Sequence, residues 1–166
     1  MRGAAGRGPD VPRIEDVSEV TRQSWLNFPV FEHQDAPFVR PTRPLREARV
    51  ALVTTAGVHL RGDRPFASSD QTFRVIPSSS PAMAIVQSHS SIGFDRTAFM
   101  RDVNISFPVD RLRELRDAGE IGSFAPDFYS FMGGSRAPRV MERETGPEVA
   151  RRLLADGVEV VLLTPT

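Results

Sequence analysis

The pattern of apolar and polar residues predicts a series of short buried strands after residue 48. The stretch "RVALVTT" is a β-branched apolar run closed by Gly57, which is typical of a central strand that leads into a turn. Two shorter apolar runs, "TFRVIP" and "AMAIVQS", flank "SSSPA", whose serines and proline indicate a loop. The last run, "VEVVLL", is too apolar for an edge strand and predicts a strand parallel to the first.

Two amphipathic helices are predicted between these strands. "PVDRLRELRDAGEIG" begins with a proline, ends at Gly119 and has one apolar stripe. "ETGPEVARRLLADG" has capping-box spacing at Thr145 and Glu148, Pro147 in its first turn and Gly157 as its stop. The apolar stripes consist of Val109, Leu112 and Leu115 in the first helix, and of Val149, Leu153 and Leu154 in the second.

This order of elements predicts an α/β fold with three layers, a mainly parallel sheet flanked by helices. Residues 1–43 hold many of the 14 prolines and are predicted to form an extended arm, with one helical turn near Val17 to Leu26. Residues 44–166 are predicted to form the α/β domain. We expect the aromatic residues of the arm to anchor it on the core; these are Trp25, Phe28, Phe31 and Phe38.

Composition then excludes several function classes. The 21 basic residues balance 21 acidic ones, so that no net charge favours binding to nucleic acid or to an anionic membrane. All the basic residues are arginine, which excludes a lysine Schiff base, a pyridoxal-phosphate lysine and a P-loop lysine in this chain. Cysteine is also absent, which excludes disulfides, cysteine-zinc sites and a cysteine nucleophile within these residues.

The termini and apolar runs also bear on location. The first residues, "MRGAAGRGPDVPR", have no apolar core of a secretory signal, and no run reaches the roughly 20 apolar residues of a membrane helix. We therefore expect a cytoplasmic protein.

Two of the three histidines follow predicted strands. His59 comes after the first strand, and His89 comes after "AIVQS" and is followed by Asp95 and Asp102. If the strand before His89 is parallel to the first, these groups meet near Thr166 at the carboxyl edge of the sheet. A histidine with a carboxylate partner can act as a general acid or base near neutral pH; the competing interpretation is that each histidine only stabilises a loop.

A glycine pair suggests a second, weaker candidate. "FMGGSRAPR" can present backbone amides and the Arg136 guanidinium to a carboxylate or phosphate. A tight turn is the favoured interpretation of such a glycine pair. His33 lies in the arm and is interpreted as structural or exposed.

Several stretches taken together resemble a known family. "RVALVTTAGVHL", "TFRVIP", "SHSSIGFDRTAFMRDVNISFPVDRLRELRDAGEIGSFAPDFYSFMGG" and "ETGPEVARRLLADGVEVVLLTP" are similar, in this order, to the selenoprotein B family of glycine, sarcosine, betaine and D-proline reductases. The similarity runs from about Pro44 to Thr166. The matching polar positions are Thr54, Thr55, His59, His89, Asp95, Asp102, Asn104, Asp110, Arg111, Tyr129 and Ser130.

The resemblance implies reductive cleavage of a carbon–nitrogen bond in a small amine. A selenocysteine or cysteine is the nucleophile, a separate subunit carries a pyruvoyl group, and a thiol or selenol protein serves as redox partner, so that an oligomeric assembly is expected. No metal is implied. The family's redox motif would start at the position after Thr166, and we expect the codon there to be UGA, with an open frame beyond it.

The resemblance also implies roles for particular residues. His89 and Asp95 are expected to act in acid–base catalysis or positioning, with Thr164 and Thr166 flanking the nucleophile. Among the matching positions, substrate binding is assigned to Thr54, Thr55, His59 and Asn104; Arg136 is added from the glycine-pair loop.

Two other functions remain open from the residues themselves. A chain without the nucleophile is a binding or regulatory relative with no activity of its own. Alternatively, His59, His89 and Asp95 form a two-histidine, one-carboxylate site for ferrous iron, which makes oxygen chemistry feasible without a thiol.

Overall fold

The computed structural model describes residues 13–28, 34, 37, 39–90, 96–135 and 137–165. The chain divides into two units, residues 1–38 and 39–166. In the first unit, a 3-10 turn at Ile14–Asp16 precedes α1, Glu19–Leu26, which confirms the predicted helical turn. Trp25 and Phe28, two of the predicted anchors, are half exposed, and the other two lie outside the described residues.

The second unit is built around strand β1, Arg49–Thr54, which confirms the predicted central strand. One side of β1 pairs in parallel with β5, Ser123–Phe124, and β6, Asp127–Phe131, while its other side pairs in parallel with β7, Val160–Thr164. Strand β3, Phe73–Pro77, adds an antiparallel strand beyond β6. The sheet is therefore mainly parallel, with β3 antiparallel.

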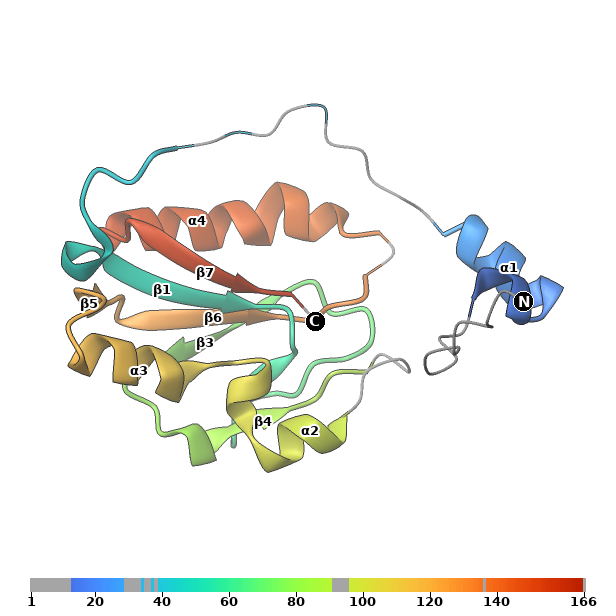
Figure 1. Ribbon diagram of the computed structural model, residues 1–166, viewed down its shortest axis with the longest axis horizontal. Helices are drawn as coiled ribbons and strands as arrows, with labels where there is room; N and C mark the ends of the chain where they lie inside the picture. The colour runs from blue at the N-terminus through green and yellow to red at the C-terminus, as the bar shows by residue number, and fades with distance from the viewer. Residues whose placement is uncertain are drawn as a thin grey trace, which may run out of the picture. The chain divides into compact units, whose positions relative to one another are not determined.

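Helices cover both faces of this sheet (Figure 1). On one face lies α4, Gly146–Ala155, whose Arg152 guanidinium stands 5.1 Å from the centroid of the Phe73 ring. On the other lies α3, Val109–Asp117, whose Arg116 guanidinium stands 5.0 Å from the centroid of the Phe124 ring. The predicted three-layer α/β fold is confirmed.

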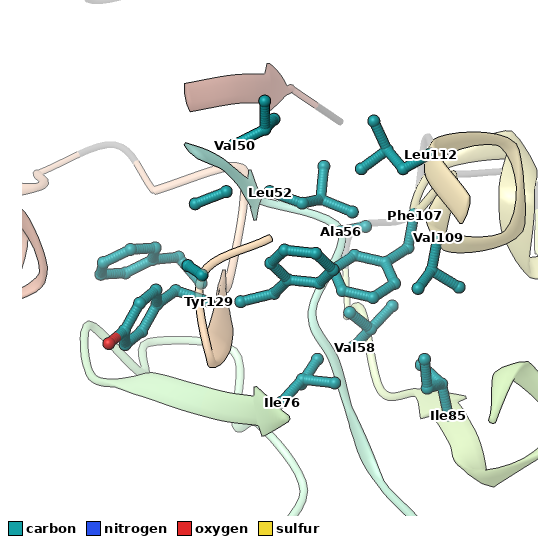
Figure 2. Close-up of a cluster of buried hydrophobic side chains, with 14 of the residues drawn as sticks. Val50, Leu52, Ala56, Val58, Ile76, Ile85, Phe107, Val109, Leu112 and Tyr129 are labelled. Atoms are coloured by element: carbon teal, nitrogen blue, oxygen red, sulfur yellow. The ribbon is translucent and has the colours of Figure 1, made fainter. Parts of the chain in front are cut away.

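Part of the core fills the space between the sheet and α3, and Val149 and Leu153 of α4 belong to the same buried cluster. Figure 2 shows the Phe107 ring beside the side chains of Val109 and Leu112, and Phe107 and Phe128 meet edge to face at 6.2 Å between centroids. Phe107, Phe128 and Leu52 are fully buried. Burying these large apolar side chains is the main source of stability for such a sheet–helix interface.

Each predicted helix forms, but neither stripe is buried throughout. Val109 and Leu112 are buried in α3, as are Val149 and Leu153 in α4, whereas Leu115 is 44% exposed and Leu154 is 73% exposed. Glycines end both helices with positive φ, 76° at Gly119 and 68° at Gly157. These two stops were therefore predicted correctly.

The predicted capping box of α4 is wrong. Helical backbone already begins before it, in a π-helical turn at Met141–Thr145, so that Thr145 has helical φ and ψ and caps nothing. Its hydroxyl donates instead to the carbonyl of Gln71, 2.7 Å away. Glu148 pairs with Arg151 and Arg152 on the exposed side of the helix.

A second, small sheet lies beside the main one. Strand β2, Val58–Leu60, pairs antiparallel with β4, Ile85–Gln87. The apolar run that precedes His89 is thus not a parallel neighbour of β1. The predicted meeting of the histidines near Thr166 required a parallel strand here, and that requirement is not met. Helix α2, Arg96–Arg101, lies beside β4 (Figure 1). Short 3-10 turns connect these elements at Leu45–Glu47, Ala82–Ala84 and Val103–Ile105.

Strand β7 occupies an edge of the described sheet, although its composition predicts an interior strand. It pairs with β1 alone among the described strands, in the parallel direction that was predicted. Val161, Leu162 and Leu163 are consequently 37%, 38% and 66% exposed. An apolar run identifies a strand but not the number of strands that flank it.

Gly122 provides a test of the packing at the start of the sheet. A Cβ at this position would lie 2.7 Å from both the Ala48 carbonyl oxygen and the Glu47 carbonyl carbon, which are backbone atoms that cannot move aside cheaply. We expect Gly122→Ala to lower the free energy of unfolding in denaturant by about 1–3 kcal/mol.

Gly62→Ala is the matched control, because nothing lies within 4 Å of its Cβ position and its φ is not positive. This change should alter the free energy of unfolding by less than about 1 kcal/mol. Equal stabilities of the two variants would show that the close approach at Gly122 is relieved without cost.

Candidate active site

Three hydroxyl side chains form a row across the carboxyl end of the parallel strands. Thr54 of β1 pairs in register with Ser130 of β6 on one side and with Thr164 of β7 on the other. Residues in register on parallel strands project from the same face of a sheet. We call these three residues the hydroxyl row; Thr54 and Ser130 are fully buried in it.

The Ser106 carbonyl holds one end of the hydroxyl row. The Thr164 hydroxyl donates to it at 3.0 Å, and the Thr54 hydroxyl lies within 3.1 Å of it and 3.0 Å of the Thr164 carbonyl. Thr54 also accepts the amide of Ala56 at 3.1 Å. The ends of β1 and β7 are thereby fixed to the segment between α2 and α3.

Ser106 also contributes a buried hydroxyl. Its side chain is 6% exposed, and its Oγ has no hydrogen-bond partner among the residues that the structure describes. Ser130, at the other end of the row, accepts the amide of Val58 at 2.9 Å. The carboxyl edge of β1 and β7 thus combines bonded hydroxyls with one buried hydroxyl that has no partner among the described residues.

Gly57 brings His89 close to the turn after β1. The φ of Gly57 is +64°, and a Cβ there would stand 3.2 Å from the Cα of His89 and 3.3 Å from its amide nitrogen. The amide of Ser88 donates to the Gly57 carbonyl at 3.0 Å. Glycine is required because both the positive φ and the close backbone contact exclude a larger residue.

Burial makes His89 a neutral imidazole near pH 7. Its side chain is 2% exposed, and burial lowers its pKa below the ordinary value of 6.5, with a smaller contribution from the positive charge of Arg96. A neutral imidazole can accept a proton, which is what a general base requires.

His59 lies in a different environment. It belongs to β2, is buried, and its Nδ1 is 2.8 Å from the carbonyl oxygen of Leu60. Its ring meets that of Phe66 edge to face, with 6.5 Å between centroids. These contacts fix the ring within the small sheet.

A cavity of about 700 Å³ lies between β4 and the segment α2 to α3. Asn104 is among its lining residues, but the Asn104 side chain is also held in place by its neighbours. Its amide donates to Asp102 at 2.8 Å and to Asp110 at 3.1 Å, and its oxygen accepts the Asp110 amide at 2.9 Å. Asn104 therefore fixes the start of α3 as well as one wall of the cavity.

The ferrous-iron hypothesis gains no support from the described part of the chain. No group of three or more histidine, aspartate or glutamate side chains in it is arranged to hold a metal ion. Asp95, the third ligand of that hypothesis, lies outside the described residues.

A comparison with protein families identifies the family of this chain. The family described as glycine/sarcosine/betaine reductase selenoprotein B matches residues 16–166. The chain belongs to this family. The resemblance seen in the sequence is thereby confirmed.

Individual relatives carry the names of reductase subunits. The D-proline reductase subunit gamma of Acetoanaerobium sticklandii is 42% identical over 124 residues, which cover 74% of this chain and 50% of the relative. The sarcosine reductase complex component B subunit beta of Peptoclostridium acidaminophilum is 29% identical over 144 residues, which cover 84% and 32%. The glycine reductase complex component B subunit gamma of Carboxydothermus hydrogenoformans is 29% identical over 145 residues, which cover 85% and 33%.

The chain thus spans between one third and one half of the length of these selenoprotein B relatives. No solved structure matches it. Among the described residues, no helix combines the length and apolar character that spanning a membrane requires.

The structure brings together some of the residues assigned to the reductase site. Thr54 and Thr164 share the Ser106 carbonyl, and the Thr55 amide donates to the Thr164 carbonyl at 3.2 Å. His89 packs behind the turn that follows these threonines. Three assigned residues lie outside the described residues: Asp95, Arg136 and Thr166.

Sequence reasoning missed Ser106 and three arginines of the cavity. Ser106 accepts hydrogen bonds through its backbone carbonyl, and the type of side chain does not indicate which backbone carbonyls take part in a site. Arg61 follows β2, while Arg96 and Arg101 occupy the two ends of α2. Arginines at the ends of short elements are the signal that was available, but only the fold shows that they line one cavity.

The lowered pKa of His89 predicts a pH dependence of stability. Below pH 6.5 the unfolded chain protonates this histidine more readily than the folded chain does, so the free energy of unfolding falls as the pH decreases. The stabilisation is complete above pH 6.5 and is lost as the pH falls through the folded pKa.

His89→Gln removes this titration and is the variant to compare. We expect the difference in unfolding free energy between the two proteins to shrink when the pH is lowered from about 7.5 to about 5. Denaturant unfolding at several pH values measures it. Parallel stability curves would contradict the assignment of a lowered pKa to His89.

Proposed function

We propose that this chain forms part of an oxidoreductase subunit that cleaves a carbon–nitrogen bond in a small amine. A thiol or selenol directly after residue 166 would supply the low-pKa nucleophile for this cleavage. The observation that carries the proposal is the fixed carboxyl end of β7, where two threonine hydroxyls meet the Ser106 carbonyl. Family membership supports the reaction type.

The described residues fit a reactive group at this edge. In parallel sheets the carboxyl ends of the strands are where ligands and catalytic groups gather. Thr54 and Thr164 hold the strand ends in a fixed position, and the buried Ser106 Oγ offers a polar contact. Positioning of this kind is a recognised contribution to catalysis.

His89 would act as the general base and then the general acid in this site. As a neutral base it can take the proton of a thiol or selenol and return it to the departing amine. This keeps the proton count balanced, since one proton leaves the nucleophile and one reaches the amine. Asp95 would orient the imidazole, and Thr55, His59, Asn104 and Arg136 would contact the substrate.

The chain requires help from partner subunits in this account. With neither lysine nor cysteine among its 166 residues, it has no side chain that activates a carbonyl or amine covalently. A pyruvoyl-bearing subunit and a dithiol or selenol redox partner would supply this activation and the two electrons. A cytoplasmic location is part of the same proposal.

The test is turnover of the complete enzyme, purified with its partner subunits and supplied with a dithiol. We expect His89→Gln to lower turnover of the amine substrate by a factor of about 100 or more, because a general base is lost. Glutamine is preferred to alanine because it leaves a smaller cavity at this fully buried position.

The pH–rate profile separates catalysis from structure. The variant should lose the limb of the profile that reports the base, while its circular dichroism spectrum remains that of the folded protein. Unchanged turnover would assign His89 a structural role. Turnover by the purified chain alone would show that no partner is needed.

A further inference from the structure

Strand β4 has one edge that no described strand covers, because it pairs antiparallel with β2 alone. In an antiparallel pair, every second residue directs its N–H and C=O to the partner strand, and the residues between direct theirs to the opposite side. The bonds on the β2 side run from the Ser88 amide to the Gly57 carbonyl, 3.0 Å, and from the Arg61 amide to the Ala84 carbonyl, 2.9 Å.

This alternation directs the backbone groups of Ile85 and Gln87 away from β2. The Ile85 amide is already bonded, since it donates to the Ala82 carbonyl in the 3-10 turn before β4. The Ile85 carbonyl and both backbone groups of Gln87 gain no partner from any described strand. Unpaired backbone groups at a strand edge are a template for another extended chain.

The cavity between β4 and the segment α2 to α3 runs along this open edge. Three consecutive residues of β4 line it, namely Ile85, Val86 and Gln87. Neighbouring side chains of a strand lie on opposite faces, so a cavity over one face would be lined by every second residue only. An extended segment in the cavity would therefore meet the unpaired backbone groups of Ile85 and Gln87.

Two exposed methionines flank the same cavity. Met83, in the 3-10 turn before β4, is 81% exposed, and Met100 of α2 is 83% exposed. Phe99 and Ile85 are buried and also line the cavity. Methionine side chains adapt their shape to a partner and are common at surfaces that bind polypeptides. Exposed apolar side chains that are grouped around a recess indicate an interaction surface.

Three arginines add positive charge to this surface. Arg61, Arg96 and Arg101 line the cavity, and none of them forms an ion pair with another described residue. Guanidinium groups bind carboxylates through two parallel hydrogen bonds. The charge of the cavity therefore favours a partner that carries aspartate or glutamate.

The two carboxylates of the cavity are bonded within the chain. Asp110 is paired with Arg113 at 3.0 Å. Asp102 accepts the amide and the side chain of Asn104, at 2.9 Å and 2.8 Å. These bonds leave the three arginines to an external partner.

We propose that the open edge of β4 docks an extended, acidic segment of another polypeptide, which pairs with Ile85 and Gln87 as a third strand of the small sheet. Carboxylates of this segment pair with the three arginines, and its apolar side chains pack against Met83 and Met100. This inference goes beyond the proposed function and does not depend on the reaction.

A second copy of this chain does not match this chemistry. The outer strands of its main sheet are β3 and β7, and neither contains an acidic residue. Their edges would bring no carboxylate to the arginines. The docked segment therefore belongs to a different polypeptide.

The experiment is calorimetric titration of the purified full chain with the synthetic peptide acetyl-Asp-Val-Asp-Leu-Asp-Val-Asp-amide. This peptide alternates carboxylates with apolar side chains, as an extended acidic strand does. We expect it to bind with a Kd below about 1 mM, and the same peptide with asparagine in place of aspartate to bind about tenfold more weakly.

Two N-methylated peptides test the strand geometry. One carries the methyl group on the nitrogen of the central leucine, and the other carries it on the aspartate that follows. Only alternate N–H groups of an added strand face β4, so one peptide should lose about tenfold or more in affinity while the other binds like the unmodified peptide. Hydrogen exchange of the Gln87 amide should slow in the complex, because this amide gains an acceptor.

Exposed side chains are changed to test the two kinds of contact. Arg101→Gln should weaken the aspartate peptide about tenfold and leave the asparagine peptide unchanged, whereas Met100→Gln should weaken both peptides. Arg143→Gln, at an exposed position of the π-helical turn, is the control and should change neither affinity.

Three results would overturn the docking site. The first is absence of binding by the aspartate peptide up to about 1 mM. The second is an equal loss of affinity for the two N-methylated peptides, which would indicate a helical or irregular ligand. The third is a concentration-dependent dimer in analytical ultracentrifugation that Met83→Glu dissociates, since a second copy would then occupy the edge of β4.

Discussion

The carbonyl of Ser106 ties the carboxyl ends of two parallel strands to the chain segment that precedes α3. It lies within hydrogen-bonding distance of the hydroxyls of Thr54 and Thr164, which occupy the same register position on β1 and β7. Among the described strands β7 is an edge strand with three exposed apolar residues, and its pairing with β1 and this contact hold its end in place. The position of anything attached beyond Thr164 depends on them.

The same segment connects the two parts of the proposed chemistry. Asp102 and Asn104 form one wall of the cavity, and Ser106 forms the contact with the hydroxyl row only two residues later. On the other side, Gln87 reaches the Ala56 carbonyl, and the backbone of His89 presses against Gly57. Binding and chemistry would therefore share a frame held by hydrogen bonds from side chains to backbone carbonyls and by the close approach of His89 to Gly57.

Much of the fold could be predicted from the sequence, because strands and helices follow from apolar periodicity and from glycine stops such as Gly119 and Gly157. Which strands pair with one another could not be predicted. The apolar run before His89 is compatible with either a parallel or an antiparallel strand. Only the structure shows that it pairs antiparallel with β2. The capping box at Thr145 failed because a π-helical turn precedes it. The family resemblance supplied Thr54 and Thr164, while Ser106, acting through its backbone, left no signal.

The most direct test of this account is hydrogen exchange across β1 and β7 in Thr54→Val, with Thr54→Ser as the control that keeps the hydroxyl. Valine removes the donor to Ser106 and Thr164 and leaves the buried Ala56 amide without its acceptor, a loss of about 1–3 kcal/mol. We expect faster exchange at Thr55 and along Val160–Thr164 in the valine variant, with β3 unchanged and the serine variant like the wild type. Equal protection of β7 in all three proteins would contradict it, because the Thr54 hydroxyl would then contribute nothing to holding the end of the strand.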